Sequence, residues 1–171
     1  MKIEDPIVLM VDDSANDALL MQTVFSRAGF TQPLQFAHDG DEAIAYLKGD
    51  GACSDRGAYP MPTVVLLDLN MPGRSGFEVL AWIRAQPGLR RLHVCILSAS
   101  CRPEDIEYAY DLGVNSFLVK PGNLEGMMHQ ARCLLAWLRL SHFAALTAPH
   151  QNGARVEHSM SSGMSTTTLL G

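Results

Sequence analysis

Polar side chains that could do chemistry follow the apolar segments of this sequence. Asp12 and Asp13 come directly after a first apolar run, and Asp68 comes directly after a later one. Ser98 and Lys120, which can donate hydrogen bonds, stand at the ends of two further apolar runs. A carboxylate beside an apolar run is costly to bury unless a partner binds it. These five side chains therefore predict a site with a chemical role.

The three carboxylates predict a divalent cation. Two carboxylates about 5 Å apart repel each other by roughly 3 kcal/mol at an effective dielectric of about 20. Three such pairs would take a large share of the ~5–15 kcal/mol that stabilises a typical domain. One lysine cannot offset all of it, whereas Mg²⁺ binds carboxylate and carbonyl oxygens and keeps part of its water shell. We expect Asp12, Asp13 and Asp68 to bind Mg²⁺, with a backbone carbonyl after Asp68 as a further ligand.

A metal site alone leaves the two donors unexplained. Ser98 and Lys120 would lie opposite the acids, which is the arrangement that an oxyanion such as a phosphoryl group requires. A carboxylate can itself accept a phosphoryl group and become an aspartyl phosphate. Asp68 is the best-placed acceptor, because it follows the strand expected between the metal-binding acids and the donors.

These side chains can meet only if the apolar runs are neighbouring strands. Five short runs have the length and β-branched content of buried strands: Ile7–Val11, Leu34–Ala37, Val64–Leu67, Val94–Leu97 and Phe117–Val119. Helical spacing predicts five helices between and after them, over 15–28, 39–48, 75–86, 103–113 and from about 123 past 137. Alternation of this kind indicates an α/β protein with a parallel sheet, whose ligand site lies beyond the carboxyl ends of the strands.

The domain organisation follows from where the apolar periodicity ends. Residues 1–146 are expected to form one domain, with one long Gly- and Pro-containing loop at Gly49–Pro62. Residues 147–171 contain eight Ser or Thr and three Gly, and no apolar period continues there. This composition predicts a disordered Ser/Thr-rich tail that is too short to be a second DNA-binding or catalytic domain.

Composition restricts the partners and the compartment. The chain has 171 residues, 47% of them hydrophobic, and its net charge of −5 argues against a nucleic-acid partner. The N-terminus lacks the features of a secretory signal, and no apolar stretch reaches the roughly 18 residues of a membrane span. The four cysteines do not have zinc-ligand spacing. We therefore expect a cytoplasmic protein with free thiols and no membrane or nucleic-acid contact.

Four segments resemble the receiver domain of two-component response regulators: VDDS at 11–14, LLDLNMPGRSG at 66–76, LSAS at 97–100 and VKPG at 119–122. The resemblance extends over about residues 5–140. It implies a flavodoxin-like (βα)5 fold, in which a doubly wound parallel five-stranded sheet has the strand order 2-1-3-4-5.

The same resemblance assigns roles to single residues. Asp68 becomes the phosphoacceptor, Asp12 and Asp13 become Mg²⁺-binding acids, and Asn70 supplies a backbone carbonyl to the metal. Ser98 and Lys120 contact the phosphoryl group, and Ser98 also acts as a switch residue together with Phe117. The implied partner is a sensor histidine kinase. The implied output is protein–protein contact rather than enzymatic turnover, beyond autophosphorylation and autodephosphorylation.

Two further features point to partners. The long loop, the SFLVKP segment and an extended last helix that contains a tryptophan resemble receivers that partner bacterial phytochrome kinases. The last helix has one apolar stripe for the sheet and a second stripe of Cys133, Trp137, Leu140 and Ala144. A second stripe favours a contact surface, and we predict a homodimer through the fourth helix, fifth strand and fifth helix.

Two other functions use similar elements. A Mg²⁺-dependent phosphatase or phosphotransferase with an aspartyl nucleophile would need a second acid two residues after Asp68, where this sequence has Asn70. A flavin carrier could share the sheet topology, but the acidic loop at Asp12 and Asp13 would repel the flavin phosphate. The response regulator is therefore the main hypothesis, and the phosphatase is the alternative.

Overall fold

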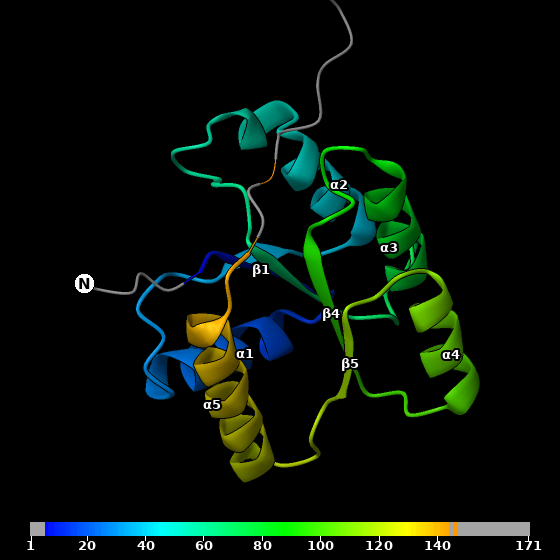
Figure 1. Cartoon of the computed structure of the whole chain (residues 1–171). Coiled ribbons are helices and arrows are strands. Elements are labelled where there is room, and N and C mark those ends of the chain that lie inside the picture. The colour runs from blue at the N-terminus through cyan, green and yellow to red at the C-terminus, as the bar shows by residue number, and fades with distance from the viewer. Residues whose placement is uncertain (1–5, 144–145, 147–171) are drawn as a thin grey trace, which may run out of the picture.

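The computed structural model describes residues 6–143 and residue 146. Strands and helices alternate along these residues (Figure 1). The strands are β1 (Val8–Val11), β2 (Gln35–Ala37), β3 (Val64–Leu67), β4 (His93–Ser98) and β5 (Ser116–Val119). The helices are α1 (Ala15–Arg27), α2 (Gly40–Lys48), α3 (Gly76–Ala85), α4 (Pro103–Asp111) and α5 (Leu124–Leu140), with a short 3₁₀ helix η1 (Gly51–Ser54). The predicted tail, 147–171, and Ala144 lie outside the described residues.

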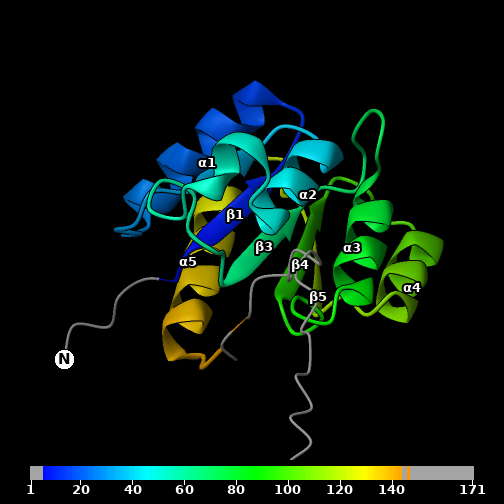
Figure 2. The same ribbon diagram turned by 90° about the horizontal axis from the view of Figure 1, so that it is seen from above.

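The five strands form one parallel sheet in the order β2-β1-β3-β4-β5. Helices α1 and α5 cover one face, and α2, α3 and α4 cover the other (Figure 2). The expected flavodoxin-like fold and its strand order are confirmed. Within the described residues, none of the helices has both the length and the apolar character needed to cross a membrane.

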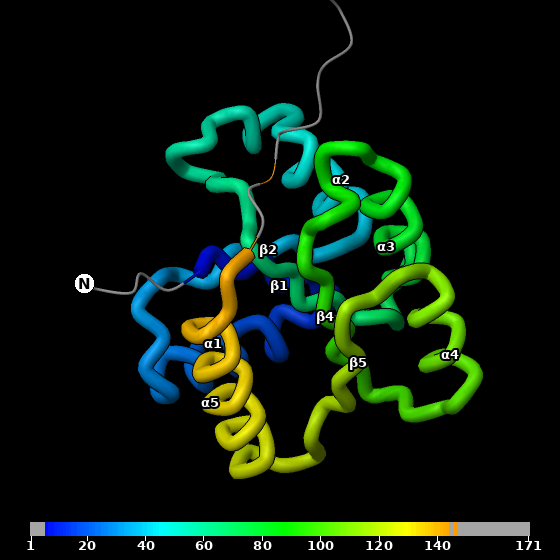
Figure 3. The backbone as a smooth tube through the Cα atoms, viewed as in Figure 1, coloured from blue at the N-terminus to red at the C-terminus, as the bar shows by residue number. Residues whose placement is uncertain are grey.

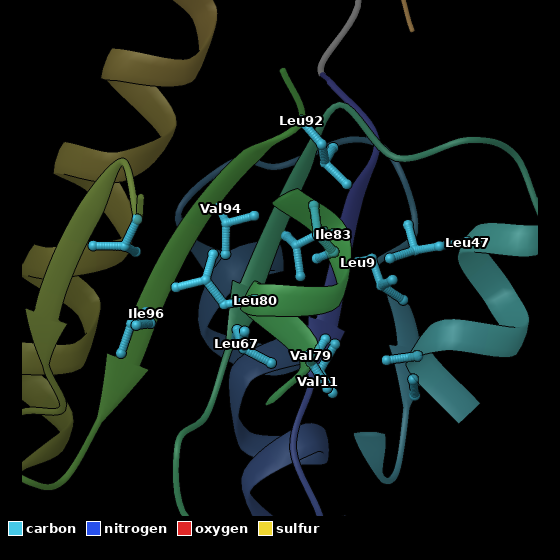
Figure 4. Close-up of a cluster of buried hydrophobic side chains, with 14 of the residues drawn as sticks. Leu9, Val11, Leu47, Leu67, Val79, Leu80, Ile83, Leu92, Val94 and Ile96 are labelled. Atoms are coloured by element: carbon cyan, nitrogen blue, oxygen red, sulfur yellow. The ribbon is translucent and has the colours of Figure 1, made fainter. Parts of the chain in front are cut away.

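The central strands are buried on both faces of the sheet. In β1, Leu9 and Val11 face the core under α2 and α3, whereas Val8 and Met10 face the core under α1 and α5. Figure 4 shows the first of these cores, where Leu9, Val11 and Leu67 meet side chains of α3. Burial of both faces explains the uninterrupted apolar runs, and it leaves only the strand ends for polar chemistry.

The helix starts follow the sequence signals with one difference. Ser14, Ser75 and Asn123 cap α1, α3 and α5 as N-cap residues, and Ser75 forms a full capping box with Glu78. At α2, Asp39 accepts a hydrogen bond from the Glu42 N–H as expected. The Glu42 carboxylate, however, accepts from the N–H of His38, one residue before the cap. The capping-box pattern at 39–42 is therefore only half formed.

The long loop between α2 and β3 packs against the end of α2. Figure 3 follows it in teal from α2 to the start of β3. The Arg56 guanidinium donates to the carbonyls of Tyr46 (2.8 Å), Leu47 (3.0 Å) and Tyr59 (3.2 Å). The Tyr46 hydroxyl donates to the Pro60 carbonyl at 2.8 Å. Arg56 thus binds the Leu47 carbonyl at the end of α2 and shares the Tyr46 carbonyl with the Gly49 N–H.

Replacing this guanidinium should loosen the loop. We expect Arg56→Ala to lower the free energy of unfolding by about 2 kcal/mol, because three charge-assisted hydrogen bonds are lost and the Leu47 carbonyl loses the Arg56 guanidinium. Urea unfolding followed by circular dichroism measures the change. Arg91→Ala, which truncates an exposed arginine elsewhere, is the matched control. Equal effects of the two variants would contradict the anchoring role of Arg56.

Candidate functional site

The sheet brings the predicted side chains to one edge, because sheet-type hydrogen bonds continue past the strands. The Asp12 N–H donates to Ala37 O (3.1 Å), and the Asp68 N–H donates to Val11 O (2.9 Å). At the other side of the sheet, the Lys120 N–H donates to Ser98 O (2.8 Å). These backbone hydrogen bonds fix the positions of Asp12, Asp68 and Lys120 independently of their side-chain contacts.

Three carboxylates converge at this edge. Asp12, Asp13 and Asp68 each offer one carboxylate oxygen, and these atoms all lie within 4.8 Å of one another. Asp12 is buried, Asp68 is half-buried and Asp13 is exposed, so the cluster opens to solvent on one side. Hard carboxylate oxygens at this spacing, with access for water, fit a Mg²⁺ or Mn²⁺ ion.

Asn70 lies in the turn that leaves the acidic cluster. Its N–H donates to Asp68 Oδ1 at 3.2 Å, which folds the backbone after β3 back toward the carboxylate. Its side-chain amide donates to the Ser98 hydroxyl at 3.4 Å. The side chain of Asn70 thus faces β4. Metal binding by its backbone carbonyl remains a prediction.

Lys120 is the cation of the site. Its Nζ lies 2.7 Å from Asp12 Oδ2, 2.8 Å from Asp68 Oδ2 and 3.3 Å from Asp17 Oδ2. Burial alone would lower the pKa of this ammonium group, but the hydrogen bonds to Asp12 and Asp68 outweigh it and raise the pKa above its ordinary value. Lys120 therefore stays protonated at neutral pH. The contact of Asp17 with Lys120 was not predicted from the sequence. The position of Asp17 in the first turn of α1, shortly after Asp12 and Asp13, could have indicated that its carboxylate lies near the site.

Ser98 ends β4 and is fully buried. Its hydroxyl oxygen accepts from the Asn70 amide and from the N–H of Ser100 at 3.2 Å. Both contacts use the oxygen as an acceptor, and neither of them engages the O–H proton. The Ser100 hydroxyl in turn donates to Asp105 of α4 at 2.6 Å. Ser98 is thereby linked to the start of α4.

The other predicted switch residue, Phe117, lies in β5, and the predicted interface residues that the structure describes lie on α5. Phe117 pairs with Ile96 in the sheet and is half-buried against the core under α3 and α4. Cys133, Trp137 and Leu140 are exposed on α5, as the second stripe predicted. The Trp137 ring also packs within the molecule, 4.8 Å from the His93 ring and 5.8 Å from the Phe143 ring between centroids.

Comparison with known proteins now identifies the family. The family model for the response regulator receiver domain matches residues 8–132. The chain belongs to this family. The matched residues include the three acids, Asn70, Ser98, Phe117 and Lys120, whereas Cys133, Trp137 and Leu140 lie beyond them.

Three relatives place the chain within the family. It is 37% identical over 128 residues to the probable methanogenesis regulatory protein FilR2 of Methanothrix harundinacea, covering 74% of this chain and 80% of that protein. It is 36% identical over 121 residues to the response regulator Rcp1 of Synechocystis, covering 71% and 80%. The crystal structure of the Mn²⁺-bound form of Rcp1 superposes with a TM-score of 0.73 at 33% identity, covering 82% and 99%. The phosphorylated cyanobacterial phytochrome response regulator RcpA gives 0.75 at 30% identity, with the same coverage.

The receiver fold of this chain requires a glycine directly behind the site. Gly76 starts α3, and its N–H donates to Leu69 O at 3.1 Å. A Cβ on Gly76 would overlap the backbone carbonyl oxygen of Asp68 and would lie 2.8 Å from the Leu69 Cα. Both neighbours are backbone atoms of the segment that holds the phosphoacceptor candidate, so they cannot move without moving Asp68.

A methyl group at this position should disturb both stability and the site. We expect Gly76→Ala to lower the free energy of unfolding by about 2 kcal/mol, as overpacking against fixed backbone does. It should also weaken Mn²⁺ binding measured by electron paramagnetic resonance. Gly122→Ala is the control, because a Cβ there meets no atom within 4 Å. A Gly76→Ala variant as stable as the control would show that the Asp68 segment can relax.

Proposed function

We propose that this chain is a response regulator whose Asp68 accepts a phosphoryl group from a sensor histidine kinase in a Mg²⁺-dependent reaction, and which then signals through protein contacts. The observation that carries the proposal is the placement of the Lys120 ammonium on Asp68, beside three carboxylates that can share a divalent ion. Membership in the receiver family supports the same reading.

The chemistry is a phosphoryl transfer between two nucleophiles. A carboxylate oxygen of Asp68 attacks the phosphorus of the kinase phosphohistidine, a P–O bond forms, and the P–N bond breaks with its electron pair remaining on the imidazole. Asp12, Asp13 and Asp68, with the Asn70 carbonyl, would hold Mg²⁺, which supplies positive charge opposite the phosphoryl oxygens. Lys120 is already hydrogen-bonded to Asp68 and donates to a phosphoryl oxygen without a large movement.

The switch begins where the new phosphoryl oxygens need donors. The Ser98 hydroxyl turns to the phosphoryl group and gives up its contacts with the Asn70 amide and the Ser100 N–H. Because Ser100 holds Asp105, this rearrangement changes the start of α4. Phe117 then follows by changing its rotamer beneath α4. Ser98 and Phe117 are thus proposed as the switch residues.

The phytochrome connection is part of the proposal. RcpA, a cyanobacterial phytochrome response regulator, matches 82% of this chain. The long loop after α2 and the tryptophan in α5 are the features by which the sequence resembles receivers that partner bacterial phytochrome kinases. We infer that the kinase partner is a bacterial phytochrome or a kinase with a similar docking surface.

The dimer surface is proposed from the distribution of exposed apolar side chains. Among the described residues, seven large hydrophobic side chains are exposed, and six of them lie on α4, β5 and α5: Tyr108, Tyr110, Val119, Leu124, Trp137 and Leu140. The seventh, Leu19, lies on α1. Exposed apolar side chains concentrated on neighbouring elements favour an interaction site, and a second copy can use the same elements across a two-fold axis. Tyr108 also packs within the molecule, against Phe77 of α3.

The phosphatase alternative has less support. Its mechanism needs a proton donor two residues after the nucleophile, and the Asn70 amide at that position cannot protonate a leaving group. The Asn70 side chain is also engaged with Ser98. Asp68 is therefore better suited to keep a phosphoryl group than to pass it rapidly to water.

Phosphorylation can be tested without knowing the kinase. Incubation with acetyl phosphate and Mg²⁺ should label the wild-type chain at one site, which peptide mapping by mass spectrometry assigns to Asp68. The label should be absent from Asp68→Asn and from wild type treated with a chelator, because the acceptor or the metal is then missing. Asp111→Asn, at the far end of α4, is the control and should label normally. Label that persists in Asp68→Asn would refute the proposed acceptor.

The dimer can be tested with two matched leucines. Leu140 is 80% exposed on α5, and Leu19 is 65% exposed on α1. We expect Leu140→Glu to give a monomer in light scattering under conditions where wild type is a dimer, because a carboxylate would be buried in the interface. Leu19→Glu should keep the dimer. A wild-type monomer mass with and without acetyl phosphate, or a dimer of Leu140→Glu, would contradict the proposed face.

A further inference from the structure

Asp17 contacts the site from outside the acidic cluster. It is the third residue of α1, and its Oδ2 lies 3.3 Å from Lys120 Nζ. The exposed fractions of the three carboxylate partners of Lys120 differ: 1% for the Asp12 side chain, 12% for Asp68 and 45% for Asp17. Lys120 is thus held by two inner carboxylates and one on the solvent side, and each can take one of its three N–H groups.

The side chain of Asp17 does not cap its own helix. A Glu or Gln three residues after an N-cap serine can accept a hydrogen bond from the serine N–H and so complete a capping box, and Asp17 occupies this position. Here the Ser14 N–H donates to Asp12 Oδ1 at 2.9 Å, while the Ser14 hydroxyl accepts from the Asp17 N–H at 3.1 Å. The Asp17 carboxylate is turned to Lys120 instead.

Asp17 also differs from the other two partners in its relation to a metal ion. Asp12 and Asp68 belong to the group of carboxylates that can share a cation, and among the described residues Asp17 does not belong to it. A divalent ion in the cluster would therefore compete with Lys120 for Asp12 and Asp68, and its charge would repel the ammonium group. The contact with Asp17 is the one that the ion does not share.

We propose that Asp17 is a positioning residue that keeps the Lys120 ammonium in the site while Asp12 and Asp68 bind a divalent ion, so that Lys120 is in place for the phosphoryl group. This inference rests on the proposed function of Asp68. Asp17 does not touch the reacting atoms and acts only through Lys120. A half-exposed ion pair is worth at most about fivefold in an equilibrium constant, which sets the size of the effect.

The first experiment observes the lysine directly. In ¹⁵N-labelled wild type, the Lys120 ammonium should give a slowly exchanging NMR signal both without and with MgCl₂. In Asp17→Asn the signal should persist without Mg²⁺ and broaden or disappear with it. Glu125→Gln, which neutralises a first-turn acid on α5, is the control and should behave like wild type. A Lys120 signal unaffected by Asp17→Asn in the presence of Mg²⁺ would overturn the inference.

The second experiment asks whether Asp17 acts through Lys120. We expect Asp17→Asn to slow labelling by acetyl phosphate about fivefold in the wild-type background, and to have no further effect in a Lys120→Met background. Equal slowing in both backgrounds would mean that Asp17 acts on the metal or the phosphoryl group by its own charge, and would refute the positioning role. Failure of the wild type to label would refute the proposed function instead, while the NMR measurement would still test the Asp17 contact.

Discussion

The structure depends on how it tolerates negative charge at one edge of its sheet. Asp12 is almost completely buried, and only Lys120 reaches it as a cation among the described residues. The two residues are 108 positions apart, and the strands that they follow are separated by β3 and β4. The ion pair therefore spans the carboxyl edge of the sheet. Removing one partner of a buried pair leaves an uncompensated charge, which costs several kcal/mol.

The ion pair does not neutralise all the negative charge at this edge of the sheet. Three carboxylates meet at the cluster and a fourth lies beside it, whereas the Lys120 ammonium group contacts three of these four: Asp12, Asp17 and Asp68. We expect the remaining negative charge to attract a divalent ion, which would then compete for the carboxylates that hold Lys120. Such competition would help Lys120 to release a carboxylate and bind a phosphoryl oxygen in its place, as the proposed function requires.

The sequence predicted which side chains meet at the edge of the sheet better than it predicted the contacts around them. Strands buried on both faces appear as uninterrupted apolar runs, so the residues that end them could be assigned to one edge once the sheet was known to be parallel. Asp17 was missed because its contact depends on how α1 is rotated against the segment after β5, 103 positions away. Arg56 was missed for a similar reason, since its role comes from the path of a loop. At 39–42 the Asp39 half of the capping box formed as predicted. The Glu42 carboxylate accepts from the N–H of His38 instead of that of Asp39, and sequence spacing alone does not distinguish these two donors.

Strand β5 connects the site with the exposed apolar face. Lys120 follows this strand directly, Val119 is 42% exposed at its end, and Phe117 lies within it. The Val119 carbonyl accepts a hydrogen bond from the Gln130 side chain at 3.1 Å. This bond connects β5 to α5 at the residue directly before Lys120. A change in what Lys120 binds would therefore act on the strand and helix that carry the proposed dimer surface, and no long chain of contacts is needed.

A second connection runs from Ser98 through Ser100 to Asp105 and reaches α4. Because the two connections start at the two donors that we propose bind the phosphoryl group, α4 and α5 would both respond to the same event.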